Sequence, residues 1–92
     1  MTYQLDKNYP NPFNPVTNIR YGLPVTSHVE LRVFDAVGRK ISLLVDQTQS
    51  SGYYTVVFDS QNLLSGVYFI QLRAVPESGA VRGITRKMTL IK

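Results

Sequence analysis

Side chains able to perform acid–base or nucleophilic chemistry are few in this chain and far apart. The single histidine, His28, directly follows Ser27, and a serine nucleophile needs a base held against its hydroxyl group. Because neighbouring residues on a strand point to opposite faces of a sheet, these two side chains are not expected to meet. We interpret His28 as a surface residue where a strand begins, and we expect no catalytic residue and no enzyme activity.

The carboxylates also lack a catalytic or metal-binding pattern. They are Asp6, Glu30, Asp35, Asp46, Asp59 and Glu77, and most fall at expected strand ends and turns. At such places an aspartate side chain caps local backbone amides. A calcium site among Asp35, Asp46 and Asp59 is the alternative, but the spacing of a calcium-binding loop is absent. The glycines are isolated and form no phosphate-binding loop, so we predict no metal and no cofactor.

Aromatic residues offer a second kind of site. The chain has 6 tyrosines and 4 phenylalanines, of which Tyr53, Phe69 and Tyr3 are the candidates to face outward and stack on a sugar ring. Cross-strand packing is the simpler interpretation, because alternating aromatics also stabilise sheets. A carbohydrate-binding accessory β-sandwich of a secreted glycosidase therefore stays as the alternative function.

The composition describes one small folded domain. Of the 92 residues, 43% are hydrophobic and 17% charged, and there is no cysteine, so packing and sheet hydrogen bonds must supply the stability. The net charge is +4, and the one basic cluster consists of Arg82, Arg86, Lys87 and Lys92. This cluster is not interleaved with exposed stacking aromatics, so a solvated face is favoured and no nucleic-acid partner is expected.

Nothing in the sequence predicts an integral membrane segment, because no apolar run approaches the roughly 20 residues that span a bilayer. The first residues lack the apolar stretch of a signal peptide. If the protein works outside the cytoplasm, we expect the chain to be a fragment of a longer exported protein.

Apolar and polar residues alternate in a way that predicts an all-β fold. The expected strands cover 18–23, 29–33, 40–46, 53–59, 67–75 and 84–92, and no helix is predicted. On each of four strands, one face is expected to be apolar or aromatic. These faces consist of Ile19, Tyr21 and Leu23; of Val29, Leu31 and Val33; of Tyr54, Val56 and Phe58; and of Tyr68, Ile70 and Leu72. Consecutive apolar residues in 40–46 indicate cover on both faces or a local bulge. Six or seven such strands are typical of a small antiparallel β-sandwich.

The connections carry recognisable turn chemistry. Asp35 and Gly38 suit the first and last positions of a type I turn. Residues 47–52 are expected to form a polar loop, and 76–83 a loop of about seven residues in a terminal hairpin. Leu63 is expected to plug the core, and Gly66 to relieve a backbone position that a side chain would obstruct.

The two ends of the chain differ from its body. The proline-rich segment is Tyr9, Pro10, Asn11, Pro12, Phe13, Asn14 and Pro15. Its prolines fix φ and remove backbone donors, so it is neither a helix nor a central strand. We divide the chain into a stiff leader, 1–17, and a β-sandwich domain, 18–92. The last nine residues alternate up to Lys92 and predict a strand whose end is accessible to a partner.

Four motifs occur in order: Asn8-Tyr9-Pro10-Asn11-Pro12-Phe13-Asn14-Pro15, Val33-Phe34-Asp35-Ala36-Val37-Gly38-Arg39, Leu64-Ser65-Gly66-Val67-Tyr68-Phe69 and Lys87-Met88-Thr89-Leu90-Ile91-Lys92. Together they closely resemble a type A C-terminal sorting domain of the type IX (Por) secretion system. The resemblance covers about residues 5–92. The ordered set is specific, although no single motif is decisive.

The resemblance implies a seven-stranded immunoglobulin-like sandwich at the C-terminus of an exported Gram-negative protein. Such a domain folds in the periplasm, is recognised by the outer-membrane translocation machinery and directs a covalently attached upstream cargo to the cell surface or the medium. A sortase-like cell-surface peptidase often removes it and can leave the cargo joined to lipopolysaccharide. A cleavage site, if used, is expected near residues 1–17, and the domain itself is a non-catalytic substrate.

The resemblance also assigns recognition residues. By position in the motifs, Gly66 and Tyr68 match the start of a characteristic strand, and Lys87, Met88, Leu90, Ile91 and Lys92 match the terminal signal strand. Recognition of a strand edge or strand end would use backbone groups for affinity and alternate side chains for specificity. Met88 and Leu90 are also candidates for the core.

Overall fold

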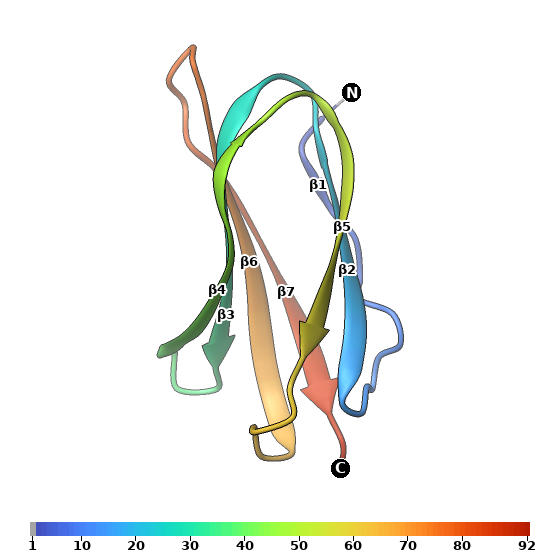
Figure 1. Cartoon of the computed structure of the whole chain (residues 1–92). Helices are drawn as coiled ribbons and strands as arrows, with labels where there is room; N and C mark the ends of the chain where they lie inside the picture. Colours follow the sequence, from blue (N-terminus) through green and yellow to red (C-terminus); the bar gives the residue numbers. More distant parts are fainter. Residues whose placement is uncertain (1) are drawn as a thin grey trace.

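Within residues 2–92, seven strands form two packed sheets (Figure 1). The computed structural model describes residues 2–92. The strands are β1 (Gln4–Leu5), β2 (Val16–Leu23), β3 (Ser27–Asp35), β4 (Lys40–Gln49), β5 (Gly52–Asp59), β6 (Gly66–Pro76) and β7 (Arg82–Leu90). No helix occurs among residues 2–92, and hence none there is long and apolar enough to cross a membrane. The predicted small all-β sandwich of about seven strands is confirmed.

The two sheets are antiparallel throughout and meet face to face. The smaller sheet has the order β1-β2-β5, and the larger sheet has the order β4-β3-β6-β7. β7 is therefore an edge strand of the larger sheet, and β1 is an edge strand of the smaller one. The Arg86 side chain bridges these two edges, because its Nε donates a hydrogen bond of 2.8 Å to the carbonyl oxygen of Leu5.

The predicted inward faces are confirmed on all four strands. Fully buried residues are Ile19, Tyr21 and Leu23 on β2, Val29, Leu31 and Val33 on β3, and Ile70 and Leu72 on β6; Phe58 and Tyr68 are nearly so, and Tyr54 and Val56 are half-buried. Burying one large apolar side chain stabilises a fold by about 1.5–3 kcal/mol. The strict alternation of these residues sets the register, because a slip by one position would expose a whole face.

A bulge, not cover on both faces, explains the apolar run in β4. The ladder between β3 and β4 shifts register between Leu31 and Arg32 and again between Val33 and Phe34. Leu44 and Ile41 are the β4 residues left without a partner in this register. An extra residue at each shift changes which face the next side chains occupy, so the apolar residues need not alternate.

Some strand boundaries differ from those predicted. The loop predicted over 47–52 is wrong in its first part, because Thr48 and Gln49 continue β4 by pairing with His28 and Ser27. β2 begins at Val16 instead of 18, and β7 covers Arg82–Leu90 instead of 84–92. The short strand β1 was not expected, since two residues give no periodicity.

The connections gather at two ends of the sandwich (Figure 1). One end holds the β3–β4 turn, the β5–β6 loop, the start of β2 and the residues after β7, all at the bottom of Figure 1. We call it the motif end and define it by residues 11–15, 35–39, 60–66 and 91–92. The opposite end holds the β2–β3, β4–β5 and β6–β7 connections.

Candidate recognition site at the motif end

The β3–β4 turn is built around one carboxylate. Asp35 Oδ1 accepts hydrogen bonds from the backbone N–H groups of Val37 and Arg39, at 3.1 and 2.9 Å, and Oδ2 accepts one from Arg39 Nε at 2.8 Å. Gly38 donates its N–H to the carbonyl oxygen of Asp35 at 3.0 Å, which confirms the predicted turn, and it has a φ of 89° that favours glycine. The Arg39 N–H is the main reason why the pKa of Asp35 lies below its ordinary range.

The β5–β6 loop leads into the strand that begins with Gly66. The hydroxyl group of Tyr68 donates a hydrogen bond of 2.6 Å to the carbonyl oxygen of Leu64, while the Tyr68 ring is buried. The Leu64 side chain is 82% exposed. Leu63 is half-buried against the core, as expected.

The prediction that a side chain at position 66 would be obstructed is wrong. Among residues 2–92, a Cβ atom at this position would have no neighbour within 4 Å, so none of their atoms would obstruct a side chain. Gly66 has a φ of 155°, a conformation that residues with a side chain rarely adopt. Backbone conformation, rather than crowding, therefore explains the glycine.

A groove of about 290 Å³ separates these two connections. Its walls include the β3–β4 turn and the start of β6, from Asp35 to Arg39 on one side and from Leu64 to Tyr68 on the other. Val37 and Leu64 border it and are 76% and 82% exposed. The strand register explains the juxtaposition, because Asp35 on β3 lies opposite Tyr68 on β6.

β7 brings the fourth motif to the same end. Met88 and Leu90 lie opposite Tyr68 and Gly66 on β6, and both side chains are buried. Lys87 alternates with them and is exposed. The core therefore takes Met88 and Leu90, and the accessible side chains of the motif are those of Lys87, Ile91 and Lys92.

The residues after β7 are held by backbone and side-chain hydrogen bonds. Lys92 donates its N–H to Ser65 Oγ at 2.9 Å, and its ammonium group donates to the carbonyl oxygen of Gln61 at 2.7 Å. Ile91 donates its N–H to the carbonyl oxygen of Phe13 at 3.1 Å, while its side chain is 54% exposed. The β5–β6 loop and the proline-rich segment thus fix the path of these two residues.

The proline-rich segment packs against the sandwich. The Phe13 side chain is 2% exposed, and its ring meets Phe58 edge-on with a centroid distance of 6.1 Å. Tyr9 exchanges two backbone hydrogen bonds with Asn18 on β2, but its own ring is 78% exposed. Asn14 is exposed as well. The position of Phe13, the one aromatic residue between Pro10 and Pro15, was the sequence signal that could have predicted this anchoring.

Short polar contacts stabilise the bend that brings Phe13 inward. The carbonyl oxygen of Pro10 accepts hydrogen bonds from Thr17 Oγ1 at 2.8 Å and from Asn8 Nδ2 at 3.2 Å. Pro15 offers its carbonyl oxygen to the N–H and hydroxyl groups of Ser60, at 2.9 and 2.7 Å. Because Asn8, Thr17 and Ser60 are buried, these bonds satisfy groups that water cannot reach.

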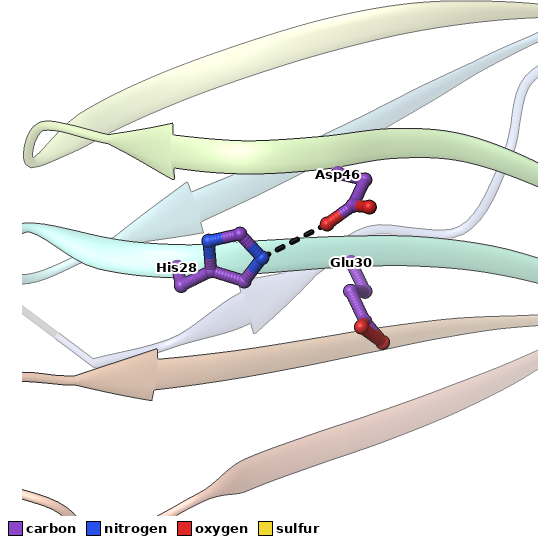
Figure 2. A group of neighbouring side chains, drawn as sticks. All are labelled: His28, Glu30 and Asp46. Atoms are coloured by element: carbon purple, nitrogen blue, oxygen red, sulfur yellow. Dashed lines mark hydrogen bonds and ion pairs between the residues drawn. The ribbon is translucent and has the colours of Figure 1, made fainter.

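Titratable side chains also gather on the outer face of the larger sheet (Figure 2). His28 Nε2 lies 2.9 Å from Asp46 Oδ1, and Glu30 lies beside them, so that potential ligand atoms of the three lie within 4.8 Å of one another. Glu30 forms an ion pair with Arg32 and faces Arg73 at 4.0 Å. Because each carboxylate has a basic partner, Arg32 and Arg73 for Glu30 and His28 for Asp46, we interpret this group as a cross-strand ion-pair network. Sequence reasoning missed it, since it depends on the β3–β4 register.

The other sequence candidates remain separate in space. Ser27 is buried and His28 exposed, so the two point apart as expected. Of the three aspartates considered for calcium, Asp46 joins the group just described. Asp35 serves the β3–β4 turn, and Asp59 accepts a hydrogen bond from the backbone N–H of Gln61 at 3.0 Å.

The three aromatic candidates do not form one platform. Tyr53 lies on β5 of the smaller sheet, where the guanidinium group of Arg20 covers its ring at 4.1 Å, and Phe69 lies on β6 of the larger sheet. Tyr3 packs against the core and bonds Ser27 Oγ at 2.6 Å. A flat sugar-stacking surface would need these rings side by side.

Comparisons with known proteins give a family and a fold. A family model described as a secretion system C-terminal sorting domain matches residues 7–85. The crystal structure of CopC from Methylosinus trichosporium OB3b is similar, with a TM-score of 0.55 and 14% identity over 97% of this chain and 93% of that chain. At this identity the likeness shows the fold alone. Among curated proteins, a search finds no match.

Proposed function

The chain belongs to the family of C-terminal sorting domains of the type IX (Por) secretion system, and from this premise we propose that it directs an attached upstream cargo through the periplasm and across the outer membrane. Members of this family are non-catalytic secretion signals. The translocation machinery recognises this domain at the motif end, and the cargo continues to the cell surface or the medium.

One observation carries this proposal: all four motifs that define the resemblance converge on one end of the sandwich. They lie far apart in the sequence, yet Asp35 and Leu64 line one groove and Lys92 bonds Ser65 beside it. The core explains the buried residues of these motifs. It does not explain why large apolar side chains, those of Val37 and Leu64, stay exposed around the groove. Exposed apolar residues gathered around a groove are typical of an interaction surface.

Removal of the domain from its cargo belongs to the same proposal. Asp6, Tyr9 and Phe13 all form backbone hydrogen bonds with the sandwich, so a peptidase would have to unfold residues 4–15 to cut there. We therefore place the cut of a sortase-like cell-surface peptidase ahead of Gln4. Transfer of the cargo to lipopolysaccharide would follow from that step, and mass spectrometry of the released domain would locate the new N-terminus.

The test is to fuse the domain behind a reporter that is exported to the periplasm of a host with an intact type IX system. We expect the fused reporter at the cell surface or in the medium, and the reporter alone in the periplasm. Retention of both in the periplasm would contradict the proposal. A host that lacks the type IX system is the second control, and it should retain both proteins.

The structure also decides which C-terminal variant is informative. Deleting residues 87–92 would remove two buried side chains, Met88 and Leu90, so lost secretion could result from lost folding. The double variant Ile91→Ala, Lys92→Ala changes accessible side chains only and should lower secretion while the domain stays folded.

A further inference from the structure

The outer edge of β7 is completed by the proline-rich segment. Thr89 donates its N–H to Asn11 Oδ1 at 3.0 Å, a contact between residues 78 positions apart. The carbonyl oxygen of Thr89 accepts a hydrogen bond of 3.0 Å from the N–H of Phe13. Both groups of Thr89 thus point away from β6, toward the edge at which a strand is normally unpaired.

This cover continues into the residues that follow the strand. Phe13 and Leu90 form a parallel bridge, in which the Phe13 carbonyl oxygen accepts the N–H of Ile91 at 3.1 Å. Ser65 Oγ then accepts the N–H of Lys92. Within the part of the chain that the structure describes, the other hydrogen bonds of Ile91 and Lys92 are those between Lys92 and the β5–β6 loop.

The side chains of Asn11 and Phe13 contribute differently, because that of Phe13 is buried and that of Asn11 is exposed. Phe13 fills the core, so its contribution to stability is expected from burial alone. The Asn11 side chain is exposed, and its carbonyl oxygen contacts the Thr89 N–H. An exposed amide that caps a distant strand edge adds little to the core, but it restricts where that edge and the residues after it can lie.

We propose that the sorting signal is composite, and that Asn11 is a positioning residue that holds Thr89–Lys92 in the orientation the translocation machinery recognises. This inference rests on the proposed function. It extends the signal to the proline-rich segment, which the sequence division into leader and domain places outside the sandwich. The segment that connects the cargo to the domain would then also present the domain's last residues.

The test compares three variants of the reporter fusion in the type IX host. Asn11→Ala removes the acceptor. Asn11→Asp keeps an oxygen that can accept the Thr89 N–H. Lys7→Ala is the control, because Lys7 is exposed on the same leader but lies outside the motif end, and its side chain forms no hydrogen bond among residues 2–92. Amide hydrogen exchange at Thr89 and the melting temperature are measured on each purified fusion.

For Asn11→Ala we expect exchange at the Thr89 amide to rise about three- to tenfold, the change in opening that one net hydrogen bond represents. Secretion of this variant should fall by a similar factor, with a melting temperature close to that of the unchanged fusion. Asn11→Asp should keep secretion near that of the unchanged fusion, and Lys7→Ala should leave it unchanged.

Two results would overturn the inference. One is normal secretion of Asn11→Ala with faster exchange at Thr89, which would show that this edge need not be held. The other is an equal loss of secretion in Asn11→Ala and Lys7→Ala, which would show a general effect of changes in the leader. Failure of the unchanged fusion to be secreted would instead contradict the proposed function. The proposed function and the composite signal are therefore contradicted by different outcomes.

Discussion

Phe13 closes the core at the motif end, where its ring lies against Phe58 and its peptide group binds the end of β7. Replacing it with alanine should lower the free energy of unfolding by about 3–5 kcal/mol, the usual cost of a deleted buried phenylalanine. Urea denaturation measures this change.

Two further variants keep that prediction testable if Phe13→Ala does not fold. Phe13→Leu should lose less stability, because it retains part of the apolar contact. Tyr9→Ala should change the free energy of unfolding by no more than about 0.5 kcal/mol, since this ring is largely exposed. A Phe13→Ala domain as stable as the Tyr9→Ala domain would show that Phe13 does not anchor the segment.

Asp35 makes the β3–β4 turn sensitive to acid. Its pKa is lowered mainly by the N–H of Arg39; burial works in the opposite direction, and the guanidinium group of Arg39 adds to the lowering. A lowered pKa means that the unfolded chain binds the proton more readily. The stability that Asp35 contributes is therefore complete above the unfolded pKa of about 3.9 and is lost as the pH falls through the lower folded pKa.

The expected result is a difference in unfolding free energy between the unchanged domain and Asp35→Ala that is constant from neutral pH to about pH 5 and shrinks below the unfolded pKa of about 3.9. Urea denaturation at a series of pH values measures it. A difference that stays the same down to pH values well below the unfolded pKa would show that the carboxylate does not stabilise the turn.

At the scale of elements, alternation gives β7 one buried face and one exposed face. Met88 points into the core and Lys87 points outward. Met88→Ala should lower the free energy of unfolding by about 2–5 kcal/mol through the cavity it leaves. Lys87→Ala should change it by no more than about 0.5 kcal/mol. Equal losses of stability in the two variants, measured by urea denaturation, would mean that the two faces of β7 are not distinct.

The strands themselves were largely predictable, because alternation in the sequence is a local property. Ile19, Tyr21 and Leu23 recur at every second position, and this pattern alone identifies the buried face of β2. β4 was less predictable, because its bulges at Ile41 and Leu44 depend on pairing with β3. β1 has no pattern of its own and exists only through its pairing with β2.

At the scale of the whole molecule, the sequence shows the four motifs but does not show that they lie at one end of the sandwich. The turn at Asp35 and the glycine at position 66 carry local signals of turn chemistry and backbone conformation. That both lie at the same end of the sandwich as Lys92 follows from the strand order β4-β3-β6-β7, which places the start of β6 next to the end of β3 and the end of β7. Strand order is a property of long-range packing, which no local pattern encodes.

The central claim is that the motif end is the recognised surface, and secretion of two charge variants of the reporter fusion tests it most directly. Leu64→Asp places a carboxylate at the motif end, and Val81→Asp places one in the β6–β7 connection at the opposite end. Both side chains are exposed, at 82% and 53%, so neither change should unfold the domain, and urea denaturation of each purified fusion verifies this. We predict that Leu64→Asp leaves the reporter in the periplasm while Val81→Asp is secreted normally. Normal secretion of a folded Leu64→Asp fusion, or equal losses in the two variants, would contradict the claim.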